Sequence, residues 1–404
     1  MDIHFDWLFL FIPFISAAVG WGTNVIAVRM MFYPVKFVGI RPIFGWQGIV
    51  PANAVELARK STDIITSRLI NLRSLFKDFD PEEFTNGNLG RSLDELTERV
   101  LVETLAERAP ETWEQAPDAV KAQIRQLVRA DLEKVAVAIL SDVSDDIESI
   151  IDLQDIVVKS AERERHVIGD MFQSVGADEF EFIRRSGAYF GFLFGIVQMG
   201  AWVSFPAWWV LPFFGFFVGY VTNFLAIKMI FQPSEPRRIG PLRVHGLFHK
   251  RQEEVSEGFA RMTARDILNP DNILAHMTSG DAGERLFQII EKHAGDMLDR
   301  YSQNPMVTAM VPDLDWDELR GELDTRFRAE LERKPDGFLY VFASRAIDIY
   351  NELFGKMAVL DAQSFEGILR PPFQKDEWKL VLAGAVLGCL AGVLQILFLF
   401  GGHL

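Results

Sequence analysis

The amino-acid sequence predicts an all-α membrane protein in which four transmembrane helices flank two cytoplasmic α-helical domains, arranged as a tandem duplication. Two features of the sequence support this class. Hydrophobic residues make up 49% of the 404 residues while the charged fraction is an ordinary 24%, so apolar and polar stretches are segregated along the chain. In addition, a segment at the end of the first predicted span occurs again at the end of the third.

Four stretches of the chain are apolar enough to cross a bilayer core, which takes about 20 mostly apolar residues in a helix. They cover residues 7–32, 187–204, 208–231 and 378–400. Tryptophans at span ends fit the aromatic belts of membrane proteins, and the first segment lacks the basic start of a cleaved secretory signal. The predicted organisation is a first span in residues 1–32, a helical domain in 33–185, a hairpin of two spans in 186–232, a second helical domain in 233–377 and a fourth span in 378–404.

The two ends of the spans differ in their basic residues, and this difference sets the predicted orientation. Asp2 and Asp6 lie on the side that holds the termini, and that side carries no lysine or arginine. Because basic residues beside spans stay in the cytoplasm, both domains are predicted to be cytoplasmic and both termini to lie outside the inner membrane. The basic residues beside the spans on the domain side are Arg29, Lys36, Arg41, Arg184, Arg185, Lys228, Arg237, Arg238, Arg370, Lys375 and Lys379.

Both predicted domains are acidic. Residues 51–185 contain 17 Lys and Arg against 28 Asp and Glu, and residues 232–378 contain 19 against 26. Nucleic acid would require clustered basic residues, so it is not predicted as a partner. The lipid bilayer is the predicted partner of the spans, and a protein partner of the acidic domains and a homo-oligomer remain open. The single cysteine, Cys389, excludes a disulfide or a cysteine-based metal site within one chain.

The duplication is clearest at the ends of the first and third spans. Residues 20–34 match residues 219–233 at seven of fifteen positions, namely the Gly, Thr, Asn, Ala, Met, Phe and Pro of the segment. The closing segments also match, although the second copy inserts residues 371–379 before its span. Each unit therefore runs span, domain, span, which predicts parallel copies related by a pseudo-twofold axis along the membrane normal.

Three motifs resemble those of the bacterial membrane family called domain of unknown function 445. They are the paired Gly-x-x-Thr-Asn-x-x-Ala-x-x-Met-x-Phe-x-Pro segments, the Gly-Trp-Gln-Gly-Ile-Val-Pro segment at residues 45–51, and the closing stretch at residues 365–395. The resemblance extends over essentially the whole chain, with a small departure at His249, where the first copy has Pro51. It implies a multi-pass bacterial membrane protein and carries over no activity.

The hydrophobic period of the two domains is helical, and few strands are predicted. Over residues 119–140 the positions that share one face are Val120, Ile124, Leu127, Val128, Leu132, Val135 and Ile139. Such faces are expected to bury against one another in helical bundles, and the alternative is a groove for an acyl chain or docking on lipid. Residues 45–48 are predicted as an interfacial loop or a half-inserted turn.

Polar side chains in or near two repeat-related spans form the candidate intramembrane site. These side chains are Thr23, Asn24, Thr222 and Asn223. Because polar groups in a membrane usually face the protein interior, they either join helices through hydrogen bonds or surround a shared site on the pseudo-twofold axis. Arg29 and Lys228 lie near the ends of the same spans and are candidate contacts for lipid headgroups.

Two stripes of glycine lie on one face each of the second and fourth spans, where they predict close helix packing. Gln198 and Gln395 extend these faces and are expected to hydrogen-bond across helices. The glycines are Gly187, Gly191, Gly195, Gly384, Gly388 and Gly392.

No catalytic signature is recognisable in the sequence, which lacks a nucleophile elbow, a phosphate loop and a dinucleotide fingerprint. The protein is therefore predicted not to be an enzyme, and no cofactor is predicted. His245, His249 and Glu253 have a helical spacing that metal ligands use, but Gly246 interrupts the helix, so no metal site is predicted. The favoured function is a non-enzymatic membrane scaffold that binds a cytoplasmic or envelope partner. The alternative is a lipid or small-amphiphile transporter or binding protein with the Thr-Asn site.

Overall fold

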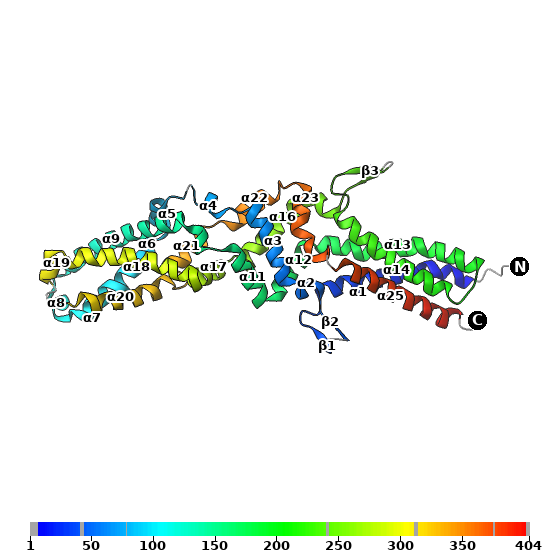
Figure 1. Cartoon of the computed structure of the whole chain (residues 1–404), viewed down its shortest axis with the longest axis horizontal. Helices are drawn as coiled ribbons and strands as arrows, with labels where there is room; N and C mark the ends of the chain where they lie inside the picture. Colours follow the sequence, from blue (N-terminus) through cyan, green and yellow to red (C-terminus); the bar gives the residue numbers. More distant parts are fainter. Residues whose placement is uncertain are drawn as a thin grey trace. The chain divides into compact units, whose positions relative to one another are not determined.

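The computed structural model describes residues 7–40, 44–77, 79–239, 242–310, 314–374 and 376–400. The secondary structure of these described residues is helical apart from two short β-hairpins (Figure 1). The chain forms two compact units, each discontinuous in sequence. One, which we call the membrane unit, comprises Met1–Ile65, Val157–Thr263 and Leu353–Leu404, and the other, the helical unit, comprises Thr66–Ile156 and Ala264–Glu352.

Four helices of the membrane unit are long and apolar enough to cross a membrane: α1 (Phe11–Phe32), α13 (Ala177–Ser204), α14 (Val210–Phe231) and α25 (Glu377–Gln395). A 3₁₀ turn, η1 (Trp7–Leu10), precedes α1, and a π-helical turn, η4 (Ile396–Phe400), extends α25. The all-α membrane class is thus confirmed, and the four candidate spans of the described residues coincide with the four predicted stretches. Residues 1–6 and 401–404 of the predicted first and fourth spans, and with them Asp2 and Asp6, lie outside the described residues, as do Arg41 and Lys375.

Glycines bring the spans together in two pairs, α1 with α13 and α14 with α25. A Cβ atom added at Gly191 would overlap the carbonyl oxygen of Ser16 on α1. A Cβ atom at Gly388 would likewise overlap the carbonyl oxygen of Gly215 on α14. The backbones of each pair therefore touch, as the glycine stripes predict for packing in lipid, where apolar surface supplies no hydrophobic drive.

A β-hairpin follows each of the first and third spans. Strands β1 (Val38–Ile40) and β2 (Phe44–Trp46) pair after α1, and β3 (Arg237–Ile239) and β4 (Leu242–Val244) pair after α14. In the first ladder Val38 lies opposite Trp46 and Gly39 opposite Gly45. The prediction of a loop or turn at residues 45–48 is therefore wrong for Gly45 and Trp46, which belong to a strand.

Short helices complete the membrane unit, and they come from both halves of the chain. Arg251 pairs with the buried carboxylate of Glu179 at 3.1 Å, and Ser61 donates a hydrogen bond to the carbonyl of Ile368 at 3.3 Å. The helices are α2 (Ile49–Ala52), α3 (Ala54–Arg68), α11 (Leu153–Arg163), α12 (Arg165–Val175), α15 (Leu247–Lys250), α16 (Gln252–Met262), α22 (Ile349–Met357), α23 (Ala362–Leu369) and α24 (Pro371–Gln374). The π-helical turn η3 (Thr263–Ile267) follows α16 and, apart from Thr263, belongs to the helical unit.

The helical unit packs the long helix α9 (Asp118–Asp145) of the first half against α18 (Gly280–Ser302) of the second. Leu132 and Ile139 of α9 are buried as predicted, whereas Leu127 is 58% exposed. The remaining helices of the unit are α4 (Leu72–Leu75), α5 (Pro81–Asn88), α6 (Gly90–Leu96), η2 (Thr97–Val102), α7 (Glu103–Arg108), α8 (Pro110–Gln115), α10 (Ile147–Ile150), α17 (Pro270–Met277), α19 (Pro305–Met310), α20 (Trp316–Leu331) and α21 (Phe338–Arg345).

Each compact unit draws on both halves of the chain. The predicted segments 33–185 and 233–377 therefore coincide with neither unit, since each contributes helices to both. Their assignment as two separate domains stays a prediction.

Candidate functional site

The two asparagines of the candidate intramembrane site each form a hydrogen bond within their own helix pair. Asn24 Nδ2 donates to the carbonyl oxygen of Ile183 on α13 at 2.6 Å. Asn223 Nδ2 donates to the carbonyl oxygen of Leu380 on α25 at 2.8 Å. Both side chains are fully buried. The structure thus places each amide at a separate helix crossing, the first between α1 and α13 and the second between α14 and α25.

The glycine stripes make room for these amides. A Cβ atom at Gly187 would lie 2.7 Å from Asn24 Nδ2, and one at Gly384 would overlap Asn223 Nδ2. Thr23 and Thr222 donate hydrogen bonds to carbonyl oxygens of their own helices and are buried. This geometry is that of interhelical packing, the first of the two alternatives for the Thr-Asn site.

The two glutamines link helices of both halves inside the membrane unit. Ser16 Oγ donates to Gln198 Oε1 at 2.7 Å, and Gln198 Nε2 donates to Gln395 Oε1 at 3.4 Å. All three side chains are buried. The sequence predicted that the glutamines hydrogen-bond across helices, but it did not single out Ser16. Ser16 lies four residues before Gly20, on the same face of α1, and this spacing was the signal that could have identified it.

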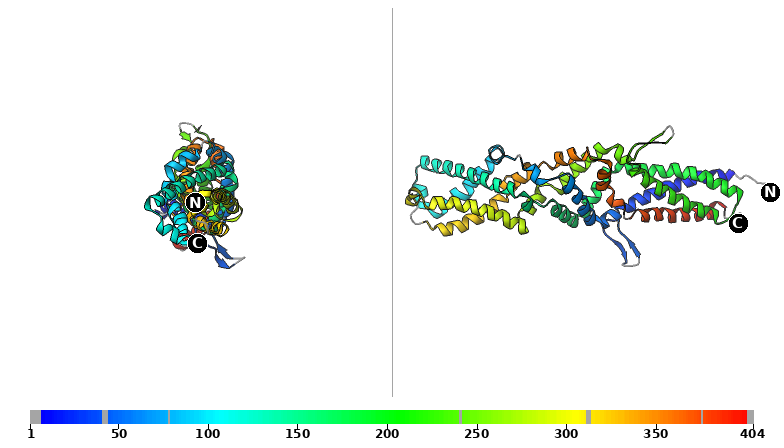
Figure 2. Two further views of the ribbon diagram at one scale, coloured as in Figure 1. Left: turned by 90° about the vertical axis from the view of Figure 1, so that its left-hand side faces the viewer. Right: turned by 45° about the horizontal axis from the view of Figure 1, so that its top comes forward.

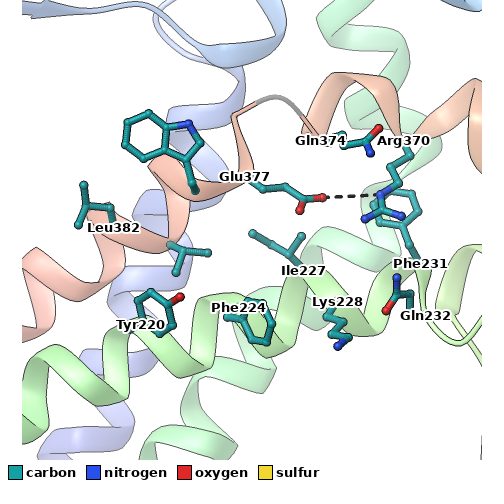
Figure 3. A pocket seen from close by; sticks show the side chains of 12 residues that line it. Tyr220, Phe224, Ile227, Lys228, Phe231, Gln232, Arg370, Gln374, Glu377 and Leu382 are labelled. Carbon is teal, nitrogen blue, oxygen red and sulfur yellow. Dashed lines mark ion pairs between the residues drawn. The ribbon is translucent and has the colours of Figure 1, made fainter.

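A cavity of about 580 Å³ lies beside the last turns of α14, between this helix and the segment that joins α23 to α25 (Figure 3). We call it the α14–α25 pocket. The side chains that α14 contributes to its lining are aromatic at Tyr220 and Phe224 and polar at Lys228 and Gln232, farther along the chain. The residues that line it are Tyr220, Phe224, Ile227, Lys228, Phe231, Gln232, Arg370, Gln374, Glu377, Trp378, Val381 and Leu382.

Charged side chains gather at one end of the pocket. Arg370 Nε lies 3.8 Å from Glu377 Oε1, and Arg370 also pairs with Glu366. Lys228 Nζ lies 5.6 Å from the centre of the Phe224 ring, within the range of a cation–π contact. Among the described residues no carboxylate pairs with Lys228. This end of the pocket therefore holds one cation whose charge is not neutralised by an ion pair.

Apolar side chains line the opposite end. Figure 3 shows Tyr220 and Leu382 there, away from Arg370 and Gln374. Trp378 and Leu382 are exposed at the surface of the span. The pocket therefore joins a polar recess at the end of α14 to an apolar wall that is exposed at the surface of the helices.

The insertion at residues 371–379 contributes Gln374, Glu377 and Trp378 to the lining of this pocket. In the first half, α13 continues without a break through residues 180–185 into the span. In the second half the corresponding segment is broken into α23, α24 and α25. Sequence reasoning noticed the insertion and named Lys228 as a headgroup contact, but it missed Arg370, Glu377 and Trp378. Arg29, the counterpart of Lys228, is exposed on α1 and is not one of the residues that line the α14–α25 pocket.

The histidines considered as metal ligands lie after the second hairpin. His245 Nε2 lies 3.2 Å from the carbonyl oxygen of Ser234, and the buried ring of His249 lies 3.8 Å from Glu366. Burial lowers the pKa of His249 below its ordinary value. Within the part of the chain that the structure describes, no group of three or more His, Cys, Asp or Glu side chains is placed to hold a metal ion.

Comparisons with known proteins agree with a membrane protein whose activity is not established. The family model described as "Protein of unknown function (DUF445)" matches residues 214–342. A "UPF0754 membrane protein" of Exiguobacterium sibiricum is 39% identical over 62 residues, which are 15% of this chain and 16% of that protein. A relative of the same name from Bacillus cereus is 31% identical over 87 residues, 21% of this chain and 23% of its own length.

A third relative of that name, from Microcystis aeruginosa, is 33% identical over 79 residues, 19% of each chain. The chain thus matches less than a quarter of the length of these relatives, and no solved structure matches it. The matched family segment begins in α14 and ends in α21, so it is shorter than the resemblance predicted over essentially the whole chain. The chain is therefore a helical, multi-pass membrane protein that resembles the family described as Protein of unknown function (DUF445), as its paired sequence motifs predicted.

Proposed function

We propose that this protein is a non-enzymatic membrane protein that binds a lipid or another small amphiphile in the α14–α25 pocket. One observation carries the proposal: the pocket joins charged side chains at the end of α14 to aromatic and aliphatic side chains, of which Trp378 and Leu382 are exposed at the surface of the span. An amphiphile has the same division between a polar head and an apolar chain. The proposal follows the alternative function predicted from the sequence, but it places the ligand beside Lys228 rather than at the Thr-Asn pairs.

The chemistry of the polar end favours a headgroup that contains phosphate. Lys228 has no carboxylate partner among the described residues, whereas Arg370 is paired with Glu366 and Glu377, so Lys228 is the cation of this end that is available to a phosphate oxygen. Basic side chains close to span ends lie at headgroup depth. A volume of about 580 Å³ falls in the range of small-ligand pockets. It suits a headgroup and the first carbons of a chain, with the rest of the chain along Tyr220 and Leu382.

Two further inferences from the sequence belong to the proposal. The basic residues beside the spans favour a cytoplasmic location for the polar end of the pocket, with both termini outside the inner membrane. A tandem duplication is supported by the order of elements, since each half has a span, a β-hairpin, further helices and a closing span. Transport along the pseudo-twofold axis is less well supported, because each asparagine is engaged at its own helix crossing.

Native mass spectrometry of the detergent-purified protein tests the proposal, with phosphatidylglycerol and phosphatidylethanolamine as probes. We expect the wild-type protein to retain about one tightly held lipid and Lys228→Gln to retain several-fold less. Arg29→Gln is the matched control, because Arg29 occupies the same position of the first half, and it should behave as wild type. The proposal is overturned if the wild-type protein retains no lipid or if both variants lose it equally.

A second candidate function is a scaffold that binds a protein partner through the helical unit. The observation that favours it is an apolar cavity of about 160 Å³ beside α9. Its walls include Trp113, Leu127 and Trp316, and Leu127 is 58% exposed. A photo-reactive amino acid at position 127 should cross-link to one defined protein, whereas the same group at Gln123, exposed on the same helix, should not. Equal cross-linking at both positions would exclude this groove as the binding surface.

A further inference from the structure

The two β-hairpins leave the membrane unit directly after α1 and α14. The views of Figures 1 and 2 show both hairpins projecting from the helices rather than packing among them. The first hairpin begins at Val38, soon after α1 ends at Phe32, and the second begins at Arg237, soon after α14 ends at Phe231. Their depth relative to a bilayer is therefore set by the ends of two spans.

The base of the first hairpin is fixed to the end of α1. Trp46 Nε1 donates a hydrogen bond to the carbonyl oxygen of Met30 at 3.2 Å, and the Gly48 amide donates to Pro34 at 2.9 Å. A Cβ atom at Gly48 would lie 2.6 Å from the carbonyl carbon of Phe32, so only glycine permits this approach. An indole at a span end is typical of the membrane–water interface.

The base of the second hairpin is fixed to the end of α14 in the same way. The Gly246 amide donates to the carbonyl oxygen of Pro233 at 2.9 Å. A Cβ atom at Gly246 would lie 2.9 Å from the carbonyl carbon of Phe231. Both hairpins are therefore held against the end of the helix that precedes them, α1 or α14.

The outer parts of the two hairpins differ in chemistry. On β1, Val38 is 63% exposed and Ile40 is 78% exposed. These two side chains project from the same face of the strand, because side chains alternate along it. Between them Gly39 has a φ of 137°, a backbone conformation that favours glycine. On β3, Arg237 and Arg238 are exposed, and neither pairs with a carboxylate among the described residues.

We propose that the hairpins are contacts with the surface of the bilayer that the spans cross. The first hairpin inserts Val38 and Ile40 into the boundary between headgroups and acyl chains. The second lies on the headgroups, where Arg238 contacts lipid phosphates. Two observations select lipid as the partner: the hairpins continue directly from the membrane-crossing helices, and exposed arginines complement the negative charge of a phospholipid surface.

The single native cysteine makes the proposal directly testable. In a Cys389→Ser background, Ile40→Cys and Arg238→Cys would each carry an environment-sensitive fluorophore, and Gln123→Cys on the exposed face of α9 would be the aqueous control. The full-length protein would be reconstituted in vesicles of phosphatidylethanolamine and phosphatidylglycerol. Quenching would be measured with nitroxide-labelled lipids and with aqueous iodide.

We expect nitroxide lipids to quench the label at position 40 at least about threefold more than the label at position 123, with protection from iodide. The label at position 238 should be quenched most by nitroxides in the headgroup, and its quenching should weaken when phosphatidylglycerol is omitted. Iodide access at position 40 equal to that at position 123 would overturn the proposal. Shielding of position 40 from both quenchers would also overturn it, because protein would then cover the hairpin.

A second variant separates membrane contact from folding. Ile40→Glu changes an exposed side chain, so its unfolding temperature in detergent should match that of wild type. In vesicles, a label at Val38→Cys should lose its protection from iodide when this substitution is added. Retained protection would show that residue 40 does not hold the hairpin in the bilayer.

Discussion

The two helix pairs of the membrane unit share one packing scheme and differ at one end. In both pairs an asparagine donates to a carbonyl of the partner helix beside a glycine. The difference lies where the closing span begins, because α13 is continuous there whereas the second pair is interrupted between α24 and α25. The interruption in the second pair is accompanied by a cavity with basic side chains at one end. The shared features thus hold helices together, and the candidate binding chemistry is found where the pairs differ.

The largest expected effect tests whether the two crossings are equivalent. Gly191→Leu and Gly388→Leu place bulky side chains where a Cβ atom already overlaps a backbone oxygen. Each should lower the free energy of unfolding by about 1–3 kcal/mol, the usual cost of overpacking. Thermal unfolding in detergent measures this. Gly22→Leu and Gly200→Leu are matched controls, since a Cβ atom at either position meets nothing within 4 Å. If only one of the two leucine variants lost stability, the two helix crossings would not be equivalent.

A smaller effect should distinguish the pairs by ligand binding. Trp378→Ala removes part of the apolar wall of the α14–α25 pocket, and Tyr189→Ala removes a side chain of α13 that is exposed on the first pair. We expect Trp378→Ala to weaken lipid retention by about 1 kcal/mol, roughly a fivefold change in affinity, because the indole is only partly covered. Competition between lipids in native mass spectrometry would measure this change. Equal weakening by Tyr189→Ala would mean that the lipid binds outside the pocket.

The asparagines should contribute less to stability than the glycines. Asn24→Ala and Asn223→Ala each remove one interhelical hydrogen bond, for which measured values in membranes average about 0.6 kcal/mol. The unfolding temperature in detergent should fall by similar small amounts for both. If either variant keeps its stability but loses lipid retention, that asparagine belongs to a binding site and the packing role assigned to it is wrong.

The smallest effect concerns the helical unit, where the halves also meet. His293 Nε2 and Lys292 Nζ of the second half lie 2.9 and 3.1 Å from Asp142 Oδ2 of the first. Hydrogen bonds from His293 and then Lys292 hold the pKa of Asp142 below its ordinary value of 3.8. A lowered carboxyl pKa stabilises the fold above that ordinary value, and the contribution is lost as the pH falls through the lower, folded-state pKa.

Asp142→Asn should therefore destabilise the protein slightly near neutral pH, by a few tenths of a kcal/mol, since the carboxylate is partly exposed and solvent screens the pair. The difference from wild type should disappear as the pH falls below 3.8. Circular dichroism melts across this pH range measure both. Asp145→Asn, a neighbouring exposed position, is the control, and an unchanged difference at low pH would show that the ionised carboxylate is not responsible.

Local patterns in the sequence were sufficient to predict the four long apolar helices and the glycine positions at which two of these helices approach closely. Span length and hydropathy depend on residues within one helix, and a stripe of glycine marks a close approach whatever the partner helix is. The prediction that Leu127 lies on the buried face was wrong, although it shares the period of Leu132. Helical periodicity identifies a face, but it does not state how far along that face a neighbouring helix extends.

Tertiary structure alone decided the pocket, the hairpins and the compact units. The pocket needs a break between α24 and α25, and it needs Arg370 and Trp378 to meet α14, which no spacing along the chain specifies. The hairpins escaped prediction because their strands have only three residues each and Gly39 and Gly45 interrupt the alternation that identifies a strand. Each compact unit contains helices from both halves of the chain. The apolar face of an amphipathic helix can pack against any apolar surface, so the sequence of the helix does not specify its partner, which depends on packing across the whole fold.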